Sequence, residues 1–182
     1  MTGPDPIDRP RDAASSKDPS AARPDAGGRT ARTPTQIVQQ LLSNPTDPDN
    51  VNPLLAPDAK YVSLNFDDPD LQRIMPWAGS HDEPDGLLQT FIDVNRYWTN
   101  EEFELTDWIE QDGKVAAFGS FTYRSTVLGQ RVTSSIAIMA EVVDEKVTYM
   151  RFMEDTFATA RSFRSGGTWT IQANPDGTTI EV

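Results

Sequence analysis

Residues 114–126 (KVAAFGSFTYRST) and residues 131–143 (RVTSSIAIMAEVV) are two runs rich in β-branched, aromatic and small apolar side chains. Similar runs precede and follow them, at residues 103–111 and 146–152. The gaps between the four runs are turn-sized and contain Asp112-Gly113, Leu128-Gly129 and Asp144-Glu145. Because such short connections join antiparallel strands, we expect four hairpin-linked strands in a curved, meandering sheet.

The segment before these strands predicts a helix and one further strand. Thr33-Pro34-Thr35-Gln36 supplies an N-cap, a proline at the first helical position and a capping-box glutamine. Apolar side chains then follow at helical spacing: Ile37, Val38, Leu41 and Leu42. Asn44-Pro45 ends this helix, and one more helical turn is expected at residues 51–55. Residues 59–66 alternate between polar and apolar side chains and predict a strand.

The remaining connections contain two more expected helices. Residues 67–81 are rich in turn residues, yet too apolar for a solvated loop, so we expect them to cover part of the domain. Glu83-Pro84 opens a helix with an apolar stripe of Leu87, Leu88, Phe91, Ile92 and Trp98. Residues 156–163 predict a closing helix. Residues 164–182 fit either a terminal hairpin or a loose tail, and the sequence leaves this choice open.

Composition excludes several classes of function. The chain has 182 residues, and 28 Asp and Glu against 16 Lys and Arg give a net charge of −12, so no nucleic-acid partner is expected. The apolar runs are too short to span a membrane and no signal-peptide core follows the N-terminus, so we expect no membrane partner and a cytoplasmic location. With no cysteine and a single histidine, disulfides, thiolate nucleophiles and His-rich metal sites are excluded.

The domain organisation follows from a change in composition near residue 32. Residues 1–32 combine six basic side chains, five aspartates and five prolines with almost no large apolar residue. Such a segment cannot bury enough apolar surface to offset its chain entropy, so we expect a disordered N-terminal leader. It is either a solvated leader or a docking segment for a partner. Residues 33–163 are then a single domain.

Two stretches carry a resemblance to a known family: LAPDAKYVS at residues 55–63 and DEKVTYMRFMEDT at residues 144–156. With the expected order of elements, they resemble the NTF2-like superfamily, in particular its SnoaL-like and ketosteroid isomerase-related proteins. The resemblance implies an α+β cone, in which a curved antiparallel sheet packs on about three helices around an interior pocket. It also implies a homodimer formed through the sheet, and a small, mostly apolar ligand such as a polyketide or terpenoid-like metabolite.

The catalytic acids of this superfamily do not occur at the positions onto which the resemblance carries them. The ketosteroid isomerase base falls on Ser63, and the final-strand acid of the SnoaL-type cyclases falls on Phe152. Serine cannot replace a carboxylate base unaided. The expected first helix has no tyrosine, and residues 131–140 have no carboxylate, so the oxyanion hole of ketosteroid isomerases is missing too.

Polar side chains nevertheless form a row on the first expected strand. Tyr61, Ser63 and Asn65 share one face, because side chains alternate along a strand. Tyr61 and Asn65 resemble the water-holding Tyr and Asn of limonene epoxide hydrolases, although their spacing is four residues instead of two. The row is either a pocket wall or a solvated strand face.

His81 and Glu154 are the candidate acid/base residues. Histidine exchanges protons most readily near neutral pH, but His81 could equally be an exposed residue before a helix. A metal site at His81-Asp82-Glu83 is not expected, because three consecutive ligands do not readily converge on one ion.

Glu154 points inward if Met150 and Phe152 do, and burial would then raise its pKa and make it a candidate base. The competing interpretation is an ion pair with a nearby arginine: Arg151, Arg161 or Arg164. Asp155 is expected to cap the closing helix.

Two functions remain open, and whether the protein is an enzyme stays open with them. In the first, an interior pocket lined by Ser63, Trp77, Met150 and Phe152 accepts a small apolar molecule, and an isomerase, lyase or hydrolase acts through Tyr61, Asn65, His81 and Glu154. In the second, the chain is a non-catalytic binding or dimerisation module that has lost the family's acids. No phosphate loop, nucleophile elbow or Walker sequence occurs, so no cofactor and no metal are expected.

Overall fold

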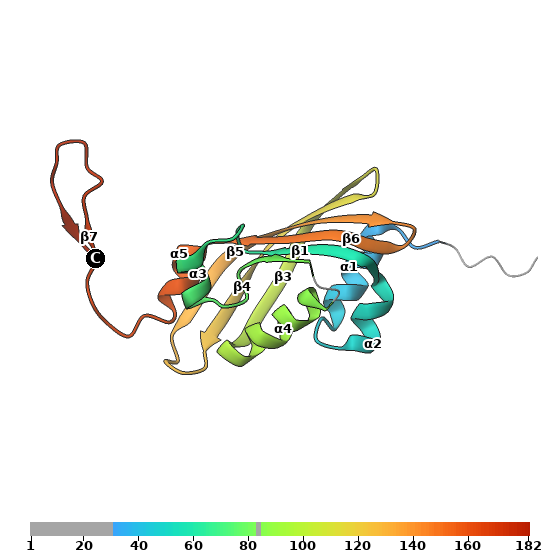
Figure 1. Cartoon of the computed structure of the whole chain (residues 1–182), viewed down its shortest axis with the longest axis horizontal. Coiled ribbons are helices and arrows are strands. Elements are labelled where there is room, and N and C mark those ends of the chain that lie inside the picture. The colour runs from blue at the N-terminus through green and yellow to red at the C-terminus, as the bar shows by residue number, and fades with distance from the viewer. Residues whose placement is uncertain (1–30, 83–84) are drawn as a thin grey trace, which may run out of the picture. The chain divides into compact units, whose positions relative to one another are not determined.

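The computed structural model describes residues 31–82 and 85–182, so the expected leader lies almost wholly outside the described residues. Six strands form one curved sheet in the order β2-β1-β6-β5-β4-β3 (Figure 1). Their bounds are β1 Leu55–Ser63, β2 Gly79–His81, β3 Trp98–Gln111, β4 Lys114–Ser125, β5 Arg131–Val143 and β6 Lys146–Glu154. The α+β architecture expected from the resemblance is confirmed.

The four consecutive strands β3 to β6 pair as an antiparallel meander, as the sequence predicts. At the β3–β4 turn, Asp112 and Gly113 both have positive φ, 50° and 80°. This is the backbone geometry of two-residue turns that match the twist of the flanking strands. Gly119 is required for a different reason, because a Cβ there would lie 1.8 Å from the carbonyl oxygen of Glu104 on β3.

The sheet departs from the expected antiparallel pattern at one side. β1 runs parallel to β6, with Ser63 opposite Phe152, and antiparallel to β2. Parallel neighbours need a long connection between them, which here contains two helices and the strands β2 to β5. β2 was not predicted, because three residues are too few to show an alternation of side chains.

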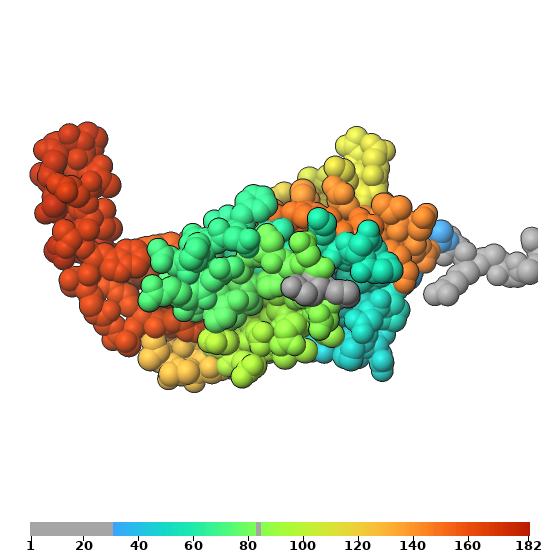
Figure 2. Space-filling model, viewed as in Figure 1, coloured from blue at the N-terminus to red at the C-terminus, as the bar shows by residue number. Residues whose placement is uncertain are grey.

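In the described part of the chain, five α-helices and one 3-10 turn complete the domain. Their bounds are α1 Pro34–Ser43, α2 Pro48–Val51, the 3-10 turn Asn52–Leu54, α3 Pro69–Ile74, α4 Gly86–Tyr97 and α5 Thr156–Arg161. The capping box of α1 is present as predicted, with Thr33 and Gln36 bonded to each other's backbone N–H. α3 lies within the connection that was expected to cover the domain, and in Figure 2 it covers the face turned to the viewer together with α4.

The limits of α4 differ from those expected. Glu83 and Pro84 lie outside the described residues, and the described helix begins at Gly86. It ends at Tyr97, because Trp98 has extended backbone angles (φ −129°, ψ 147°) and pairs with Ser125 as the first residue of β3. Trp98 therefore belongs to the sheet and not to the helical stripe.

The core lies between α1, α4 and the concave face of the sheet. Ile37, Val38 and Leu41 of α1 are fully buried in one cluster with Phe121 and Ile138. The opposite face of the sheet carries exposed apolar side chains: Ile109 (61% exposed), Phe118 (44%) and Met139 (37%). The homodimer implied by the resemblance stays a prediction.

The C-terminal segment forms a short hairpin, which decides between the two interpretations of residues 164–182. β7 (Thr170–Ile171) pairs with β8 (Ile180–Glu181), and the backbones of Trp169 and Val182 extend the pairing. No helix within the described part of the chain is long and apolar enough to cross a membrane.

Candidate functional site

A cavity of about 40 Å3 lies between α4 and the concave face of the sheet. Its walls come from β1, β3, β4, β5, β6 and α4, and most of the lining is aromatic or aliphatic. The polar side chains that reach it through a hydroxyl or carboxyl group are Tyr61, Ser63, Thr90, Tyr123 and Glu154. Among the described residues that line it, none is Lys, Arg or His. The lining is therefore mostly apolar with a few hydroxyl and carboxyl groups, a composition that small-molecule sites share, although such sites have volumes of roughly 300–1,000 Å3.

Glu154 supplies the carboxyl group of this cavity. Its Oε1 atom is inaccessible to solvent and has no hydrogen-bond partner among the described residues. Burial raises the pKa of Glu154 from 4.5 to about 7; the nearby Asp155 charge adds to this, and the Thr159 hydroxyl opposes it. At neutral pH both the acid and the carboxylate are therefore populated, which is the condition for a group that both takes and returns a proton.

Two tyrosine hydroxyls share the cavity with this carboxyl group. Burial raises the pKa of Tyr61 and of Tyr123, and the negative charge of Glu154 raises both further. A hydrogen bond with the Ser63 side chain partly offsets the shift at Tyr61. Both phenols therefore stay protonated around neutral pH and act as hydrogen-bond donors.

The end of β6 is held by its neighbours, which fixes the position of Glu154. Glu154 lies opposite Ile136 of β5, and the Asp155 backbone N–H donates to the Ser134 hydroxyl at 3.0 Å. The Asp155 carboxylate accepts a hydrogen bond from the Ala158 N–H at 3.0 Å and caps α5, as predicted. The chain thus turns sharply from strand to helix directly after Glu154.

α5 is in turn fastened to the wall of the cavity. The indole N–H of Trp98 donates to the Ser162 hydroxyl at 2.9 Å, and this hydroxyl donates to the Thr159 carbonyl oxygen at 2.7 Å. Both Thr159 and Ser162 are buried. The bonds couple the aromatic wall at Trp98 to the helix that follows Glu154.

Aromatic rings fill most of the remaining interior. Phe152 packs edge-on against Tyr61 and Phe91, with ring centroids 5.9 and 5.5 Å apart. Trp77 packs edge-on against Trp98 at 5.1 Å. These contacts keep the cavity small.

Two wider clefts flank the cavity along α4. One, of about 320 Å3, shares Phe91, Phe103 and Tyr123 with it and continues to the α1–α2 connection. The other, of about 300 Å3, shares Trp77 and Thr90.

The structure places the sequence-predicted residues as follows. Tyr61, Ser63, Trp77, Phe152 and Glu154 line the cavity. Two other predicted residues lie outside this lining. Asn65 is exposed and outside the lining, because β1 ends at Ser63 and Leu64 has a positive φ of 66°, which breaks the alternation. Met150 is fully buried in the core and does not reach this cavity.

His81 lies beside the cavity and not in it. Its ring stacks on Tyr61 at 5.8 Å between centroids, and its Nε2 atom is 2.9 Å from the carbonyl oxygen of Trp77. It lines the cleft shared through Trp77 and Thr90. Any catalytic role of His81 stays a prediction.

The ion pair that competed for Glu154 does not form. Arg151 points to the opposite face of β6 and lies over the ring of Phe66, 4.4 Å from its centroid. Arg161 and Arg164 lie over Phe157 and Trp169. Among the described residues no ion pair reaches Glu154, so its carboxyl group has no neutralising cation.

The sequence reasoning missed two polar residues of the lining, Thr90 and Tyr123. Tyr123 follows Phe121 by two residues on β4 and therefore faces the same side, so the alternation that placed Phe121 inside could have found it. Among the described residues, no group of three His, Asp or Glu side chains is placed to hold a metal ion.

Comparison with solved structures defines the class of this fold. An NTF2-like protein from Burkholderia thailandensis superposes with a TM-score of 0.63 at 20% identity, covering 74% of this chain and 99% of that one. The putative polyketide cyclase IdmH from Streptomyces antibioticus superposes with a TM-score of 0.56 at 14% identity, covering 72% of this chain and 98% of that one. No family model matches the sequence. The fold is NTF2-like.

Sequence comparison narrows this class to a family. The chain is 38% identical to "Patulin biosynthesis cluster protein F" of Penicillium expansum over 170 residues, covering 90% of this chain and 85% of that protein. It is 40% identical to "Patulin synthesis protein F" of Aspergillus clavatus over 154 residues, covering 81% of this chain and 78% of that protein. The chain belongs to the family of these fungal F proteins, and its fold is NTF2-like.

Proposed function

We propose that the protein is an enzyme that transfers a proton on a small, neutral, mostly apolar metabolite bound in the interior cavity. The observation that carries this proposal is Glu154, a buried carboxyl group with an unpartnered oxygen and a pKa raised to about 7 in an apolar cavity. A buried charge without a partner costs stability, so such a group is retained where its chemistry is needed.

The proposed chemistry is an isomerisation or an elimination. The Glu154 carboxylate removes a proton from a carbon next to a carbonyl group, and the electron pair of that bond moves onto the carbonyl oxygen. The hydroxyls of Tyr61 and Tyr123 donate hydrogen bonds to this oxygen and stabilise its developing charge. The electron pair then returns from the oxygen and restores the carbonyl group while Glu154 gives the proton back. The proton goes either to a second carbon conjugated with the enolate, which completes an isomerisation, or to a hydroxyl on the β-carbon, whose C–O bond breaks as a C=C bond forms and water departs.

The lining of the cavity supports a neutral substrate. No cation of the described lining would offset the charge of a substrate carboxylate, which Glu154 would in addition repel. The cavity of about 40 Å3 accommodates only the reacting end, and the 320 Å3 cleft at Phe91, Phe103 and Tyr123 has room for the rest. The substrate is therefore a compact molecule with a few polar oxygens at one end.

The relatives point to the same kind of substrate. Their names connect them to patulin biosynthesis. We place the substrate of this chain among the small oxygenated metabolites of that chemistry. The activity then resembles those of the SnoaL-like polyketide cyclases and ketosteroid isomerases in its use of an interior acid/base, with Glu154 in place of the acids missing at Ser63 and Phe152.

Genetic complementation tests this proposal without knowledge of the substrate. The full chain is expressed in a Penicillium expansum strain that lacks its protein F, and patulin is quantified by liquid chromatography and mass spectrometry. We expect the wild-type chain to restore patulin and Glu154→Gln to fail at equal protein level, because the amide cannot exchange the proton. Glu104→Gln, on the exposed outside of β3, is the matched control and should restore it.

Two results would contradict the proposal. If Glu154→Gln restores patulin production, the Glu154 carboxyl group is not required for the reaction. If the wild-type chain does not restore patulin, its substrate differs from that of its relatives.

A non-catalytic binding module is the second candidate function. It is favoured by the small interior, which aromatic rings largely fill, and by Ser63 and Phe152 at positions where the resemblance expects acids. Native mass spectrometry of protein purified from its own host distinguishes the two. A module retains an unchanged ligand at one molecule per subunit, whereas an enzyme converts an added substrate in excess of its own concentration.

A further inference from the structure

A second, larger cleft lies on the other side of α5, between the start of β5 and residues 164–166. Its volume is about 500 Å3, and it shares no lining residue with the interior cavity. Three arginines line it: Arg131, Arg161 and Arg164. No Asp or Glu occurs among its described lining residues. A concentration of positive charge in a chain with a net charge of −12 requires an explanation.

Aromatic rings hold two of these guanidinium groups in place. Arg161 lies over the ring of Phe157, 5.7 Å from its centroid, and Arg164 over Trp169 at 5.6 Å. The two rings contact each other edge-on at 5.4 Å. A guanidinium group that stacks on a ring keeps the N–H donors at its edge available for an anion.

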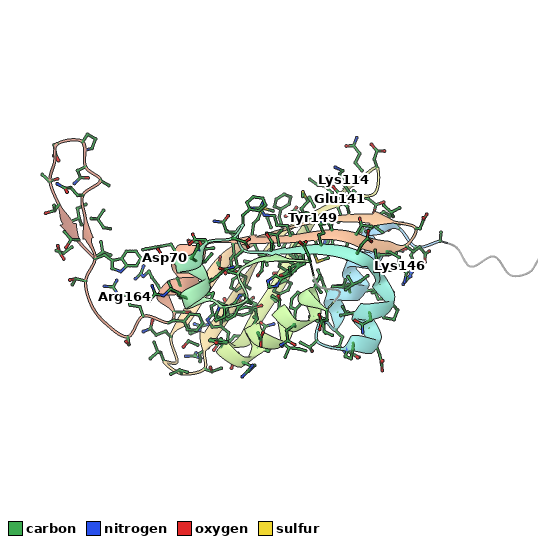
Figure 3. The ribbon with its side chains drawn as sticks, in the orientation of Figure 1. Asp70, Lys114, Glu141, Lys146, Tyr149 and Arg164 are labelled. Carbon is green, nitrogen blue, oxygen red and sulfur yellow. The ribbon has the colours of Figure 1, made fainter. Side chains whose placement is uncertain are left out.

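The charges of these arginines are poorly compensated within the described part of the chain. Arg161 forms no ion pair and no side-chain hydrogen bond with another described residue, and its guanidinium group lies over the Phe157 ring. Arg164 donates to the backbone oxygens of Gly166 (3.3 Å), Gly167 and Val182 (2.9 Å) and forms no ion pair with a described Asp or Glu side chain. Figure 3 labels Arg164 where the C-terminal segment leaves α5.

Arg131 forms an ion pair with a carboxylate that also pairs with a second arginine. Its Nε atom donates to Glu101 at 2.6 Å, and Arg124 donates to the other oxygen of the same carboxylate, also at 2.6 Å. The terminal nitrogens of Arg131 have no described partner. The cleft thus presents an excess of positive charge and a set of free N–H donors.

We propose that this cleft binds the phosphate group of a small anionic ligand. A phosphate dianion supplies three acceptor oxygens and two negative charges, which matches several converging guanidinium groups better than a single carboxylate does. The side chains of Gln130 and Ser165 provide further polar groups on the same wall. At about 500 Å3 the cleft also has room for an organic part beside the phosphate.

Isothermal titration calorimetry on the purified full chain tests this site. The probes are inorganic phosphate, ADP and adenosine, all at constant ionic strength set with sodium chloride, because screening alone weakens surface electrostatics. We expect saturable binding of phosphate and ADP and none of adenosine. ADP binding more tightly than phosphate identifies an organophosphate as the ligand, and equal affinities identify free phosphate.

Variants of the stacked arginine show where the anion binds. Arg161→Gln should weaken phosphate binding about tenfold, and Arg161→Lys, which keeps the charge, should weaken it less. Arg73→Gln is the control, since Arg73 is highly exposed on α3 and does not line this cleft. No saturable phosphate binding, or equal binding by wild type and Arg161→Gln, would overturn the proposal. Glu154→Gln should bind phosphate as wild type does, so this result is independent of the proposed activity.

Discussion

The interior cavity and the arginine cleft lie on two sides of the same short helix, and their chemistry is opposite. The cavity has a buried carboxyl group and no cation among its described lining residues, whereas the cleft has three arginines and no acid. α5 separates them, with Thr159 and Ser162 buried beneath it. The segment from Glu154 to Arg164 thus contributes an acid to one site and arginines to the other, and these opposite charges do not form an ion pair with each other.

The difference between the two sites shows that burial and hydrogen-bond partners, and not proximity in the sequence, determine the pKa of a carboxyl group. Glu101, beside the cleft, accepts hydrogen bonds from Arg131 and Arg124, which lower its pKa. Glu154, in the cavity, has no such donor, and burial raises its pKa to about 7. Arg161 and Arg164 do not compensate Glu154, because they stack on aromatic rings outside the cavity.

The largest expected effect is on stability, and it tests the uncompensated state of Glu154 directly. The pKa of Glu154 is about 7 in the folded protein against an ordinary value of 4.5, so within this window the unfolded chain has lost a proton that the folded protein retains. The free energy of unfolding therefore falls as pH rises from about 4.5 to 7, by at most about 3 kcal/mol. Glu154→Gln should lack this fall and be more stable than wild type at pH 8.

Chemical denaturation at pH 5, 6, 7 and 8 measures this difference between the variant and wild type. Glu104→Gln, an exposed residue, is the control and should follow the wild-type profile. If Glu154→Gln destabilises the protein at pH 8, the Glu154 carboxylate has a stabilising partner in the folded protein. Its environment would then not differ from that of Glu101 in the way described above. A variant that is more stable but inactive would be the signature of a group retained for its chemistry.

The second prediction concerns the tyrosine hydroxyls that belong to the cavity but not to the cleft. Tyr123→Phe removes one hydrogen-bond donor from the proposed site and should lower kcat about a hundredfold, since such a donor contributes about 2.7 kcal/mol to the transition state. Turnover is measured on the metabolite that accumulates in the strain used for complementation. Tyr149→Phe is the control, because Tyr149 lies on the outer face of β6 (Figure 3). Equal loss in both variants would attribute the effect to folding and not to the site.

The parts of the fold predicted from sequence are those with strong local signals. The four-stranded meander follows from β-rich runs joined by short turns, and α1 from its capping box. β2 and the parallel pairing of β1 with β6 depend on contacts between distant segments, which local periodicity does not contain. Asn65 was misplaced for a similar reason, since the positive φ of Leu64 breaks the alternation at a point that the sequence pattern does not mark.

The site was harder to predict than the fold, because its electrostatics depend on tertiary contacts. Alternation along β6 placed Glu154 inward correctly, but could not decide between an acid in a cavity and an ion pair with a nearby arginine. That choice depends on the stacking of Arg161 and Arg164 on Phe157 and Trp169, residues whose contacts form only in the folded domain. Met150, equally inward on β6, is fully buried in the core and lies outside the lining of the cavity.

The smallest expected effect concerns Thr159, which separates the two sites on α5. Its side-chain hydrogen bond with Glu154 lowers the pKa of Glu154, in opposition to burial. Thr159→Val keeps the shape of this fully buried side chain and removes the hydroxyl, so the pKa of Glu154 should rise further, by less than about one pH unit. The pH at which stability stops falling should move upward accordingly, whereas phosphate binding in the arginine cleft should not change. Thr156→Val, at the start of the same helix, is the control.

A lower pKa of Glu154 in Thr159→Val would contradict this prediction. It would mean that solvent entering beside the valine stabilises the carboxylate more than the lost hydroxyl did. The cavity would then be less isolated from water than its contrast with the arginine cleft requires.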